Sequence, residues 1–244
     1  AGAVGFSGGN IFYDSLITAV ASEKTIDSAS ALGFALGYLG GGVLFLLNVI
    51  MYLYPDAFGI PDQPTAIRIA FVCVAVWWAV FSLPLLLFVP EPEPESALSI
   101  TAAFRGGWRQ LRNTFREVRY LRQVGIFLLA YWFYIDGVDT IVRMAVDYGT
   151  ALGFSSESLV AALLLVQFIA FPAALAYGWF GRRIGVKRAL MVAICAYGLI
   201  TLYGYFLREL WQFYALAVMV GLFQGGIQAL SRSYYTRLIP ENKS

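Results

Sequence analysis

The chain has 244 residues, of which 59% are apolar and 13% charged, and its mean hydropathy is +0.70. This balance is typical of a membrane protein and excludes an ordinary soluble domain. The net charge of +2 does not indicate a nucleic-acid partner. The absence of histidine excludes imidazole chemistry, and the two cysteines lie in different apolar segments, which predicts no metal site.

Long apolar runs divide the chain into membrane-spanning helices. About 18 or more apolar residues suffice to cross a bilayer core of about 30 Å as a helix. By this measure the sequence predicts seven spans, at residues 5–21, 31–53, 66–89, 123–148, 156–180, 189–207 and 210–230. The connections are rich in glycine, proline and charged residues, as expected outside lipid. The predicted fold class is therefore all-α, a polytopic transmembrane helical bundle.

The second predicted span contains the segment GFALGYLGGG, in which Gly33, Gly37 and Gly41 recur every four residues. Small residues on one helix face let two backbones approach closely in a membrane. We interpret the repeat first as a site of close helix packing. A hinge that moves during gating is the alternative interpretation.

Residues 90–120 form the longest connection. It begins with PEPEPE, which cannot continue a helix because alternate prolines remove hydrogen-bond donors. Beyond it, arginines from Arg105 to Arg119 recur in steps of four and three beside an apolar stripe that includes Trp108. This pattern predicts an amphipathic helix in the headgroup region, with its arginines towards anionic lipid. A basic connection that only fixes orientation is the simpler interpretation.

Basic residues lie almost entirely on one side of the predicted spans. Arg68 and Arg208 flank one side, whereas Lys24, the arginines of residues 105–122, the cations of GRRIGVKR and those of the C-terminal segment flank the other. Lys and Arg near the ends of spans are retained in the cytoplasm. The sequence therefore predicts that residues 90–120 and the GRRIGVKR connection are cytoplasmic.

The stretch YWFYIDGVDTIVRMAVDYG, residues 131–149, carries four charges inside an apolar run. At 100° per residue, Asp136, Asp139, Arg143 and Asp147 lie within an arc of about 80° on one helix face. A charge near the bilayer centre costs about 2.5 to 3.5 kcal/mol on insertion scales, so such residues normally face a bundle interior or a water-filled path. The stripe is therefore expected to point inward.

We interpret Asp136 and Asp139 first as candidates for transport or proton coupling, with structural pairing as the alternative. For Arg143 and Asp147 the order is reversed, because Arg143 is four residues from both Asp139 and Asp147 and such spacing favours ion pairing. Asp136 has no basic partner on its own helix. It is the expected proton site, because a low-dielectric cavity disfavours its charged form.

Other polar side chains in the predicted spans are candidates to line the same cavity. Each can hydrogen-bond a solute or hold two helices together. They are Asn10, Asp14, Tyr134, Gln167, Gln224 and Gln228.

A membrane-embedded enzyme acting on a lipid is a rival interpretation, because carboxylate pairs bind Mg²⁺ together with substrate phosphates. The depth of Asp136 and Asp139 argues against it, since such an enzyme needs its carboxylates near the headgroups. We therefore expect no enzyme, no catalytic residue, no metal and no cofactor. A membrane scaffold that transports nothing is the third interpretation.

The segments FYIDGVDTIVRMAVDYG, GFALGYLGGG and GGIQALSRSYYTRLIPENKS resemble the major facilitator superfamily, in its autophagy-related vacuole-effluxer-like branch. The resemblance implies a twelve-helix fold, of which this chain holds about seven, helices four to ten. Because the chain starts at Ala1 rather than methionine, we expect a piece of a longer protein. On this plan residues 1–89 belong to the N-terminal six-helix half, 90–120 are the cytoplasmic linker, and 121–244 belong to the C-terminal half.

The resemblance also implies a function, a secondary transporter that moves a small solute by alternating access, with the lipid bilayer and the solute as its partners. Fungal members of the branch are linked to amino-acid efflux from the vacuole, so amino acids and protons are the finer expectations. The expected location is the cytoplasmic membrane, or the vacuolar membrane in a fungus.

The segment GWFGRRIGVKR resembles the cytoplasmic loop motif of the superfamily. Gly178, Gly185, Lys187 and Arg188 fit the motif. Arg182 stands where the family usually has an aspartate, which puts the charge-relay latch ascribed to that motif in doubt.

Overall fold

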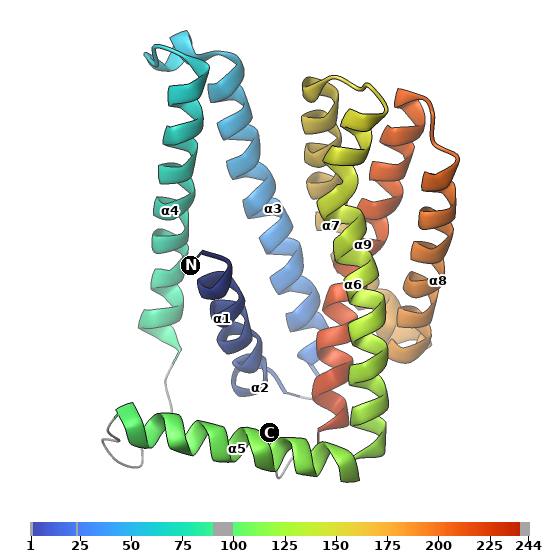
Figure 1. The fold of residues 1–244 in the computed structure, drawn as a ribbon. Helices are drawn as coiled ribbons and strands as arrows, with labels where there is room; N and C mark the ends of the chain where they lie inside the picture. Colours follow the sequence, from blue (N-terminus) through green and yellow to red (C-terminus); the bar gives the residue numbers. More distant parts are fainter. Residues whose placement is uncertain (1, 23, 90–99, 240–244) are drawn as a thin grey trace.

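The structure is a computed structural model that describes residues 2–22, 24–89 and 100–239. Its helices are α1 (Gly2–Ser15), α2 (Ile17–Val20), α3 (Ile26–Leu53), the short 3₁₀ helix η1 (Pro55–Phe58), α4 (Gln63–Phe88), α5 (Ile100–Tyr120), α6 (Arg122–Ala151), α7 (Ser156–Ile184), α8 (Val186–Tyr205) and α9 (Leu210–Leu238) (Figure 1). Within the described residues, α3, α4, α6, α7, α8 and α9 are long and apolar enough to cross a membrane. The predicted all-α, polytopic fold class is confirmed.

The first predicted span, residues 5–21, is wrong as a single helix. The chain breaks at Leu16 into α1 of 14 residues and α2 of 4. The Leu16 N–H bonds to the Tyr13 carbonyl and the Ser15 hydroxyl donates to the Phe12 carbonyl at 2.7 Å, so local hydrogen bonds compete with the helical pattern. The described part of α1 is about 21 Å long at 1.5 Å per residue. The described residues therefore contain 6 helices of spanning length rather than seven.

The long helices form two groups that meet along α3. Figure 1 shows α3 beside α4, the group α6 to α9 next to them, and α5 lying across one end. The main contacts between the groups are those of α3 with α7 and α9. Because α3 begins and α7 and α9 end near α5, the basic residues of these termini gather at this end. The positive-inside rule predicts that this end is cytoplasmic, and this stays a prediction.

Within the second group, α9 lies at the centre of the packing. Ile227 and Leu230 of α9 are fully buried, and Tyr177 of α7 belongs to the same cluster. At Gly226 an added Cβ would lie 2.2 Å from the Cγ of Tyr177, so this close approach requires a glycine. In a membrane such contacts stabilise mainly through van der Waals packing, because lipid tails are as apolar as the side chains.

Glycines also bring α3 close to α7. A Cβ added at Gly42 would lie 3.2 Å from the Cβ of Gln167, and one added at Gly178 would lie 2.5 Å from the Cβ of Ala31. A Cβ added at Gly37 would meet no described atom within 4 Å. Close packing therefore explains the glycines at the α7 contact, while a hinge at Gly37 stays a prediction.

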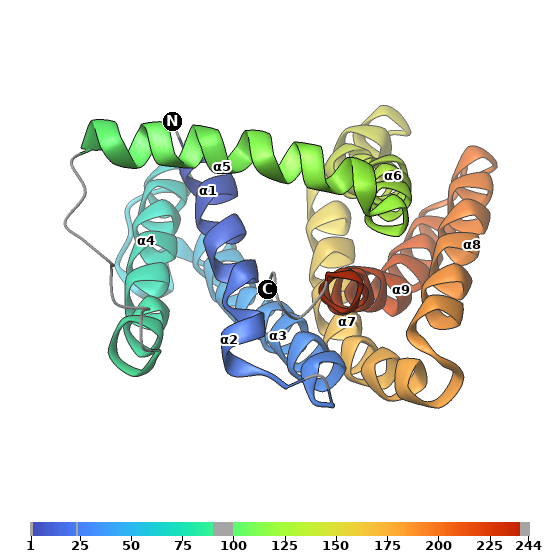
Figure 2. The same ribbon diagram turned by 90° about the horizontal axis from the view of Figure 1, so that it is seen from below.

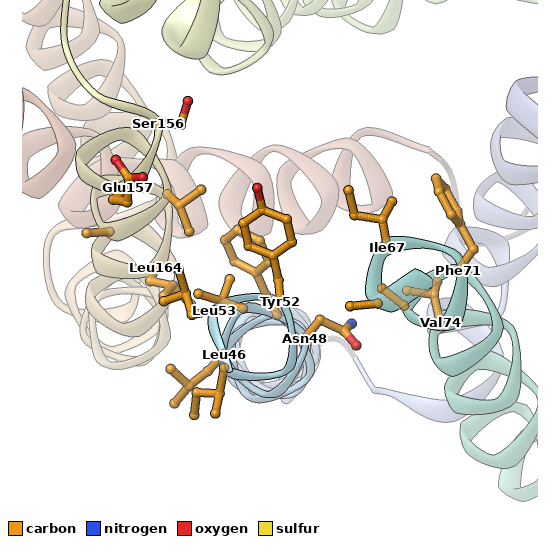
Figure 3. A pocket seen from close by; sticks show the side chains of 17 residues that line it. Leu46, Asn48, Tyr52, Leu53, Ile67, Phe71, Val74, Ser156, Glu157 and Leu164 are labelled. Carbon is orange, nitrogen blue, oxygen red and sulfur yellow. The ribbon is translucent and has the colours of Figure 1, made fainter. Parts of the chain in front are cut away.

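At the end away from α5, a cavity of about 570 Å³ lies among α3, α4 and α7 (Figure 3). We call it the outer cavity. Its walls are apolar apart from four residues, Asn48, Tyr52, Ser156 and Glu157. The two groups of helices are therefore separated at this end by a space lined with few hydrogen-bonding side chains.

Candidate functional site

Three arginines of α7 and α9 reach across to α1 and the start of α3 at the α5 end. We call this set of contacts the arginine seam. It consists of Arg182, Arg232 and Arg237 on one side and Asp14, Asp27, Ser28 and Ser30 on the other. Figure 2 shows the end of α9 beside α3 in this region.

Arg232 makes the largest number of contacts in the seam. Its Nη1 donates to Asp14 Oδ1 at 2.8 Å, its Nε donates to Ser30 Oγ at 3.0 Å, and its Nη2 donates to the Ser30 carbonyl at 3.2 Å. Its guanidinium also lies over the Phe34 ring, 4.6 Å from the centroid, and near Tyr13 at 5.6 Å. The side chain is only 12% exposed. One residue of α9 thus holds both α1 and α3, using the planar fork that distinguishes arginine from lysine.

Asp27 and Arg237 form the second contact of the seam. Arg237 Nη2 lies 2.5 Å from Asp27 Oδ2, and the aspartate is only 3% exposed. The other carboxylate oxygen is buried without a hydrogen-bond partner among the described residues. A buried charge loses its hydration, so removal of its partner is strongly destabilising. Asp27 therefore depends on Arg237, and the two helices that carry them are held together.

Two further hydrogen bonds complete the seam. Arg182 Nη1 donates to the Ser28 hydroxyl, and the Ser30 hydroxyl donates to the Ala229 carbonyl at 2.8 Å. Arg182, at the position where the motif resemblance leads us to expect an aspartate, makes a contact between the two groups of helices. The cations lie on α7 and α9, and the carboxylates that they meet lie on α1 and α3.

A cavity of about 510 Å³ adjoins the seam between α1, α2, α6 and α9. We call it the inner cavity. Asp14 and Arg232 line it, together with hydroxyl groups of Ser15, Thr18, Ser231 and Thr236 and the aromatic rings of Phe127, Tyr131 and Tyr235. Its volume falls within the range of about 300 to 1,000 Å³ that is typical of small-molecule sites. The lining thus combines one acidic and one basic residue, hydroxyl-bearing residues and apolar surface.

The charged stripe of α6 lies on the side of the helix away from its packing. Val138 is buried in the core of the second group, and Asp136 lies about 160° around the axis from it. Asp139 is half-buried and pairs with Arg143 at 3.6 Å, as its spacing predicts. Asp136 and Asp147 are exposed, and among the described ion pairs none joins Arg143 to Asp147. A transport or coupling role for this stripe stays a prediction.

The six candidate cavity residues separate into different environments. Asp14 lies in the seam. Tyr134 shares a 2.7 Å hydrogen bond with Ser231, which lines the inner cavity, and Gln228 accepts a 2.6 Å hydrogen bond from Tyr38 of α3. The remaining three are Gln224, which is buried, Gln167, which packs against the glycines of α3, and Asn10, which is exposed.

The loop motif residues divide into packing and surface positions. Gly178 lets α7 approach α3, and Gly185 ends α7 with a φ of 93°, a left-handed value that favours glycine. Lys187 and Arg188 are exposed in the first turn of α8. Arg182 is the motif residue that enters the seam.

Sequence reasoning missed Arg232, Arg237, Asp27 and Ser30 as members of a site. The two arginines counted only as cytoplasmic charges, and Asp27 fell in a segment read as a connection. Their pairing links positions about 200 residues apart, at separations of 202 and 210 in the chain. Helix periodicity carries no information about such contacts, although the segment GGIQALSRSYYTRLIPENKS already indicated this part of α9 through its family resemblance.

The model of the vacuole effluxer Atg22-like family matches residues 18–244 of the chain. The chain belongs to this family. The comparison with solved structures finds no match. Together with the helices of spanning length, membership in the Atg22-like family identifies an integral, multi-pass membrane protein.

Curated relatives match the Atg22-like chain over nearly its whole length. The uncharacterized MFS-type transporter YxiO of Bacillus subtilis is 38% identical over 245 residues, which is 98% of this chain and 56% of the relative. Autophagy-related protein 22 of Yarrowia lipolytica is 28% identical, covering 88% of this chain and 40% of the relative. The same protein of Eremothecium gossypii is 27% identical, covering 93% and 47%. The chain therefore spans about half the length of these relatives.

Proposed function

We propose that the full-length protein is a secondary transporter that moves a small solute across a membrane by alternating access. The observation that carries this proposal is the arginine seam, which joins the two groups of helices at one end beside a cavity of suitable size. The names of the relatives, an MFS-type transporter and proteins of the vacuole effluxer family, favour transport over the lipid-modifying enzyme considered above.

In this proposal the structure corresponds to a state closed at the cytoplasmic end. The inner cavity opens to the cytoplasm when α1 and α3 move away from α7 and α9, which requires Arg232 to leave Asp14 and Ser30. A solute drives this change only to the extent that it binds the two states with different affinity. A solute that takes over the hydrogen bonds of Arg232 does so, because it replaces contacts that hold the closed state.

The finer proposal is that the solute is zwitterionic, with amino acids as the class to test. Asp14 offers a carboxylate to an ammonium group, and Arg232 offers a guanidinium to a carboxylate. Phe127, Tyr131 and Tyr235 give apolar surface for a side chain. The same proposal places the protein in the cytoplasmic membrane, or in the vacuolar membrane of a fungus.

Uptake into vesicles that contain the purified full-length protein tests this function. Arg232→Lys keeps the charge but loses the planar fork, so we expect transport of a labelled amino-acid mixture to fall about tenfold or more. Arg183→Gln removes an arginine from the same end, where it lies over the Trp179 ring, and serves as the control. An unchanged rate for Arg232→Lys would remove the seam from the mechanism, and no solute flux by the parent would contradict the function itself.

Proton coupling is the second finer proposal, with Asp136 as the proton site. Protonation of Asp136 removes its charge, which allows the carrier to change state without moving an unpaired charge out of water. Asp136→Asn should therefore abolish uptake driven by a proton gradient while exchange of solute continues. Asp139→Asn removes the ion pair with Arg143, whose side chain is 80% exposed, and should lower stability by less than about 1 kcal/mol. Uptake at the parent rate by Asp136→Asn would exclude this residue from coupling.

A further inference from the structure

Helix α5 carries an amphipathic surface that has no part in the proposed transport mechanism. Figures 1 and 2 show α5 lying across the end of the bundle, at a large angle to the spanning helices. A single residue, Leu121, separates its end at Tyr120 from the start of α6 at Arg122. Because α6 has the length and composition of a membrane span, this short connection holds the end of α5 at the membrane surface.

One face of α5 is apolar and open. Phe104, Trp108 and Leu111 lie within an arc of about 60° around the helix axis. Their side chains are 79%, 66% and 49% exposed, so the described residues leave most of this face uncovered. A helix at the membrane surface buries such a face in the boundary between headgroups and acyl chains.

The basic residues of α5 form an edge beside the apolar face. Arg105, Arg109 and Arg112 lie about 80° to 140° around the axis from Phe104. All three are exposed, and they make no ion pair with any residue that the structure describes. We call these three residues the arginine edge.

The face next to the arginine edge is uncharged from residue 104 to residue 114, and Glu117 lies on the same face near the end of the helix. Gly106, Gln110 and Asn113 lie about 180° to 240° around the axis from Phe104, and none of them carries a charge. The cations are therefore gathered on one lateral edge. When the apolar face points into the bilayer, this edge lies sideways at the depth of the lipid phosphates and the neutral face points towards water.

We infer that the arginine edge of α5 binds the headgroups of anionic phospholipids in the cytoplasmic leaflet. Arginine binds phosphate through its planar fork, and the three guanidinium groups have no acidic partner within the described protein to compete. A lipid also buries the adjoining apolar face, because its acyl chains lie next to its headgroup. A free phosphate ion fits only the edge, so the two features together select a lipid.

The test uses the full-length protein in phosphatidylcholine vesicles, with its own cysteines replaced and Trp108→Cys labelled with a bimane fluorophore. Trace spin-labelled phosphatidylglycerol or spin-labelled phosphatidylcholine is added in separate samples. We expect stronger quenching by the anionic lipid. Replacing Arg105, Arg109 and Arg112 with glutamine should remove this preference, and each arginine lost should lower it by up to about fivefold.

Matched variants separate the effect of the positive charge on the lipid preference from any effect of changing the helix itself. Replacing the same three arginines with lysine keeps the charge and should retain most of the preference, whereas Gln110→Ala with Asn113→Ala alters only the neutral face and should leave it unchanged. Equal quenching by the two lipids in the parent protein would overturn the inference. Absence of quenching by either lipid would do so too, since it would show that protein covers the apolar face.

Inorganic phosphate, added at constant ionic strength, distinguishes a lipid site from a general anion site. The preference should persist in excess phosphate, because a free ion does not satisfy the apolar face. Its complete loss would overturn the assignment to lipid.

Discussion

The two ends of the helical bundle are held in different ways. At the α5 end, arginines of α7 and α9 bind carboxylate, hydroxyl and carbonyl groups of α1 and α3. At the other end the same groups of helices enclose the outer cavity, whose walls are largely apolar. The α5 end is thus specified by directional polar contacts, whereas the walls of the outer cavity carry few hydrogen-bonding side chains.

This difference indicates how the bundle changes state. Hydrogen bonds and ion pairs in a region of low dielectric constant are strong, and leaving one partner unpaired there is costly. We therefore expect the contacts of the seam to form together or to be replaced together by contacts with a solute. Apolar walls fit one another in more than one arrangement, since dispersion has little directionality. The seam is therefore the element that a solute must act on, and the outer cavity is the space that adjusts.

Removal of Arg232 should have the largest effect on this asymmetry. Arg232→Ala leaves Asp14 and two hydrogen-bond acceptors of Ser30 without their partner, which we expect to cost about 3 kcal/mol. Arg143→Ala removes an ion pair whose side chains are 80% and 47% exposed and should cost less than about 1 kcal/mol. Thermal unfolding of both variants in one detergent compares the losses. Equal losses would show that the seam is no stronger than an exposed pair.

Added bulk should be tolerated at one end and not at the other. Gly178→Val places its Cβ against Ala31 at the seam, where overpacking is expected to cost about 2 kcal/mol. Ala161→Val adds similar bulk at the outer cavity and should change stability by less than about 0.5 kcal/mol. The unfolding midpoints of the two variants measure this contrast. A larger loss for Ala161→Val would mean that the outer cavity is as tightly packed as the seam.

The charge of Asp27 should matter less than the presence of Arg232. Asp27→Asn keeps an oxygen that accepts from Arg237 but loses the charge assistance, so we expect a cost of about 1 kcal/mol. Glu157→Gln is the matched change at the outer cavity, where Glu157 is exposed, and should have an effect too small to measure. Chemical unfolding in mixed micelles gives both values, and a larger effect for Glu157→Gln would contradict the assignment of buried charge to the seam.

The smallest expected effect concerns Asp62, in the connection before α4. Its carboxylate caps α4 by accepting from the Thr65 N–H at 2.7 Å, and hydrogen bonds from the side chain and backbone of Thr65 lower the pKa of Asp62 below its ordinary value of 3.8. The cap therefore contributes fully above about pH 4 and is lost as the pH falls through the lower folded pKa. Hydrogen exchange in the first turn of α4 should rise in that range, and Asp62→Asn should show no such pH dependence.

Much of the fold was predictable from the sequence, because apolar runs of spanning length report directly on membrane helices. The prediction failed for the first span, residues 5–21, which breaks at Leu16. Local hydrogen bonds around Ser15 accompany this break, and they do not change the apolar content of the segment. The Asp139–Arg143 pair was also predictable, because its spacing of four residues is local.

The seam was not predictable in the same way. Asp27 and Arg237 carry no local pattern that joins them, and only the packing of α3 against α9 brings them together. Family resemblance identified the segment that contains Arg232 but not its partners. Contacts between distant helices depend on tertiary structure, which neither hydropathy nor periodicity records.

Distances between spin labels in the full-length protein test the central claim most directly. One pair at Lys24 and Lys187 reports on the cytoplasmic end, and a second pair at Ala57 and Ala151 reports on the outer end; all four positions are exposed and lie outside the seam. We predict that Arg232→Ala lengthens the first distance and shortens the second, because the seam holds one end closed while the other stays apart. Unchanged distances at both ends in a folded Arg232→Ala protein would contradict this account.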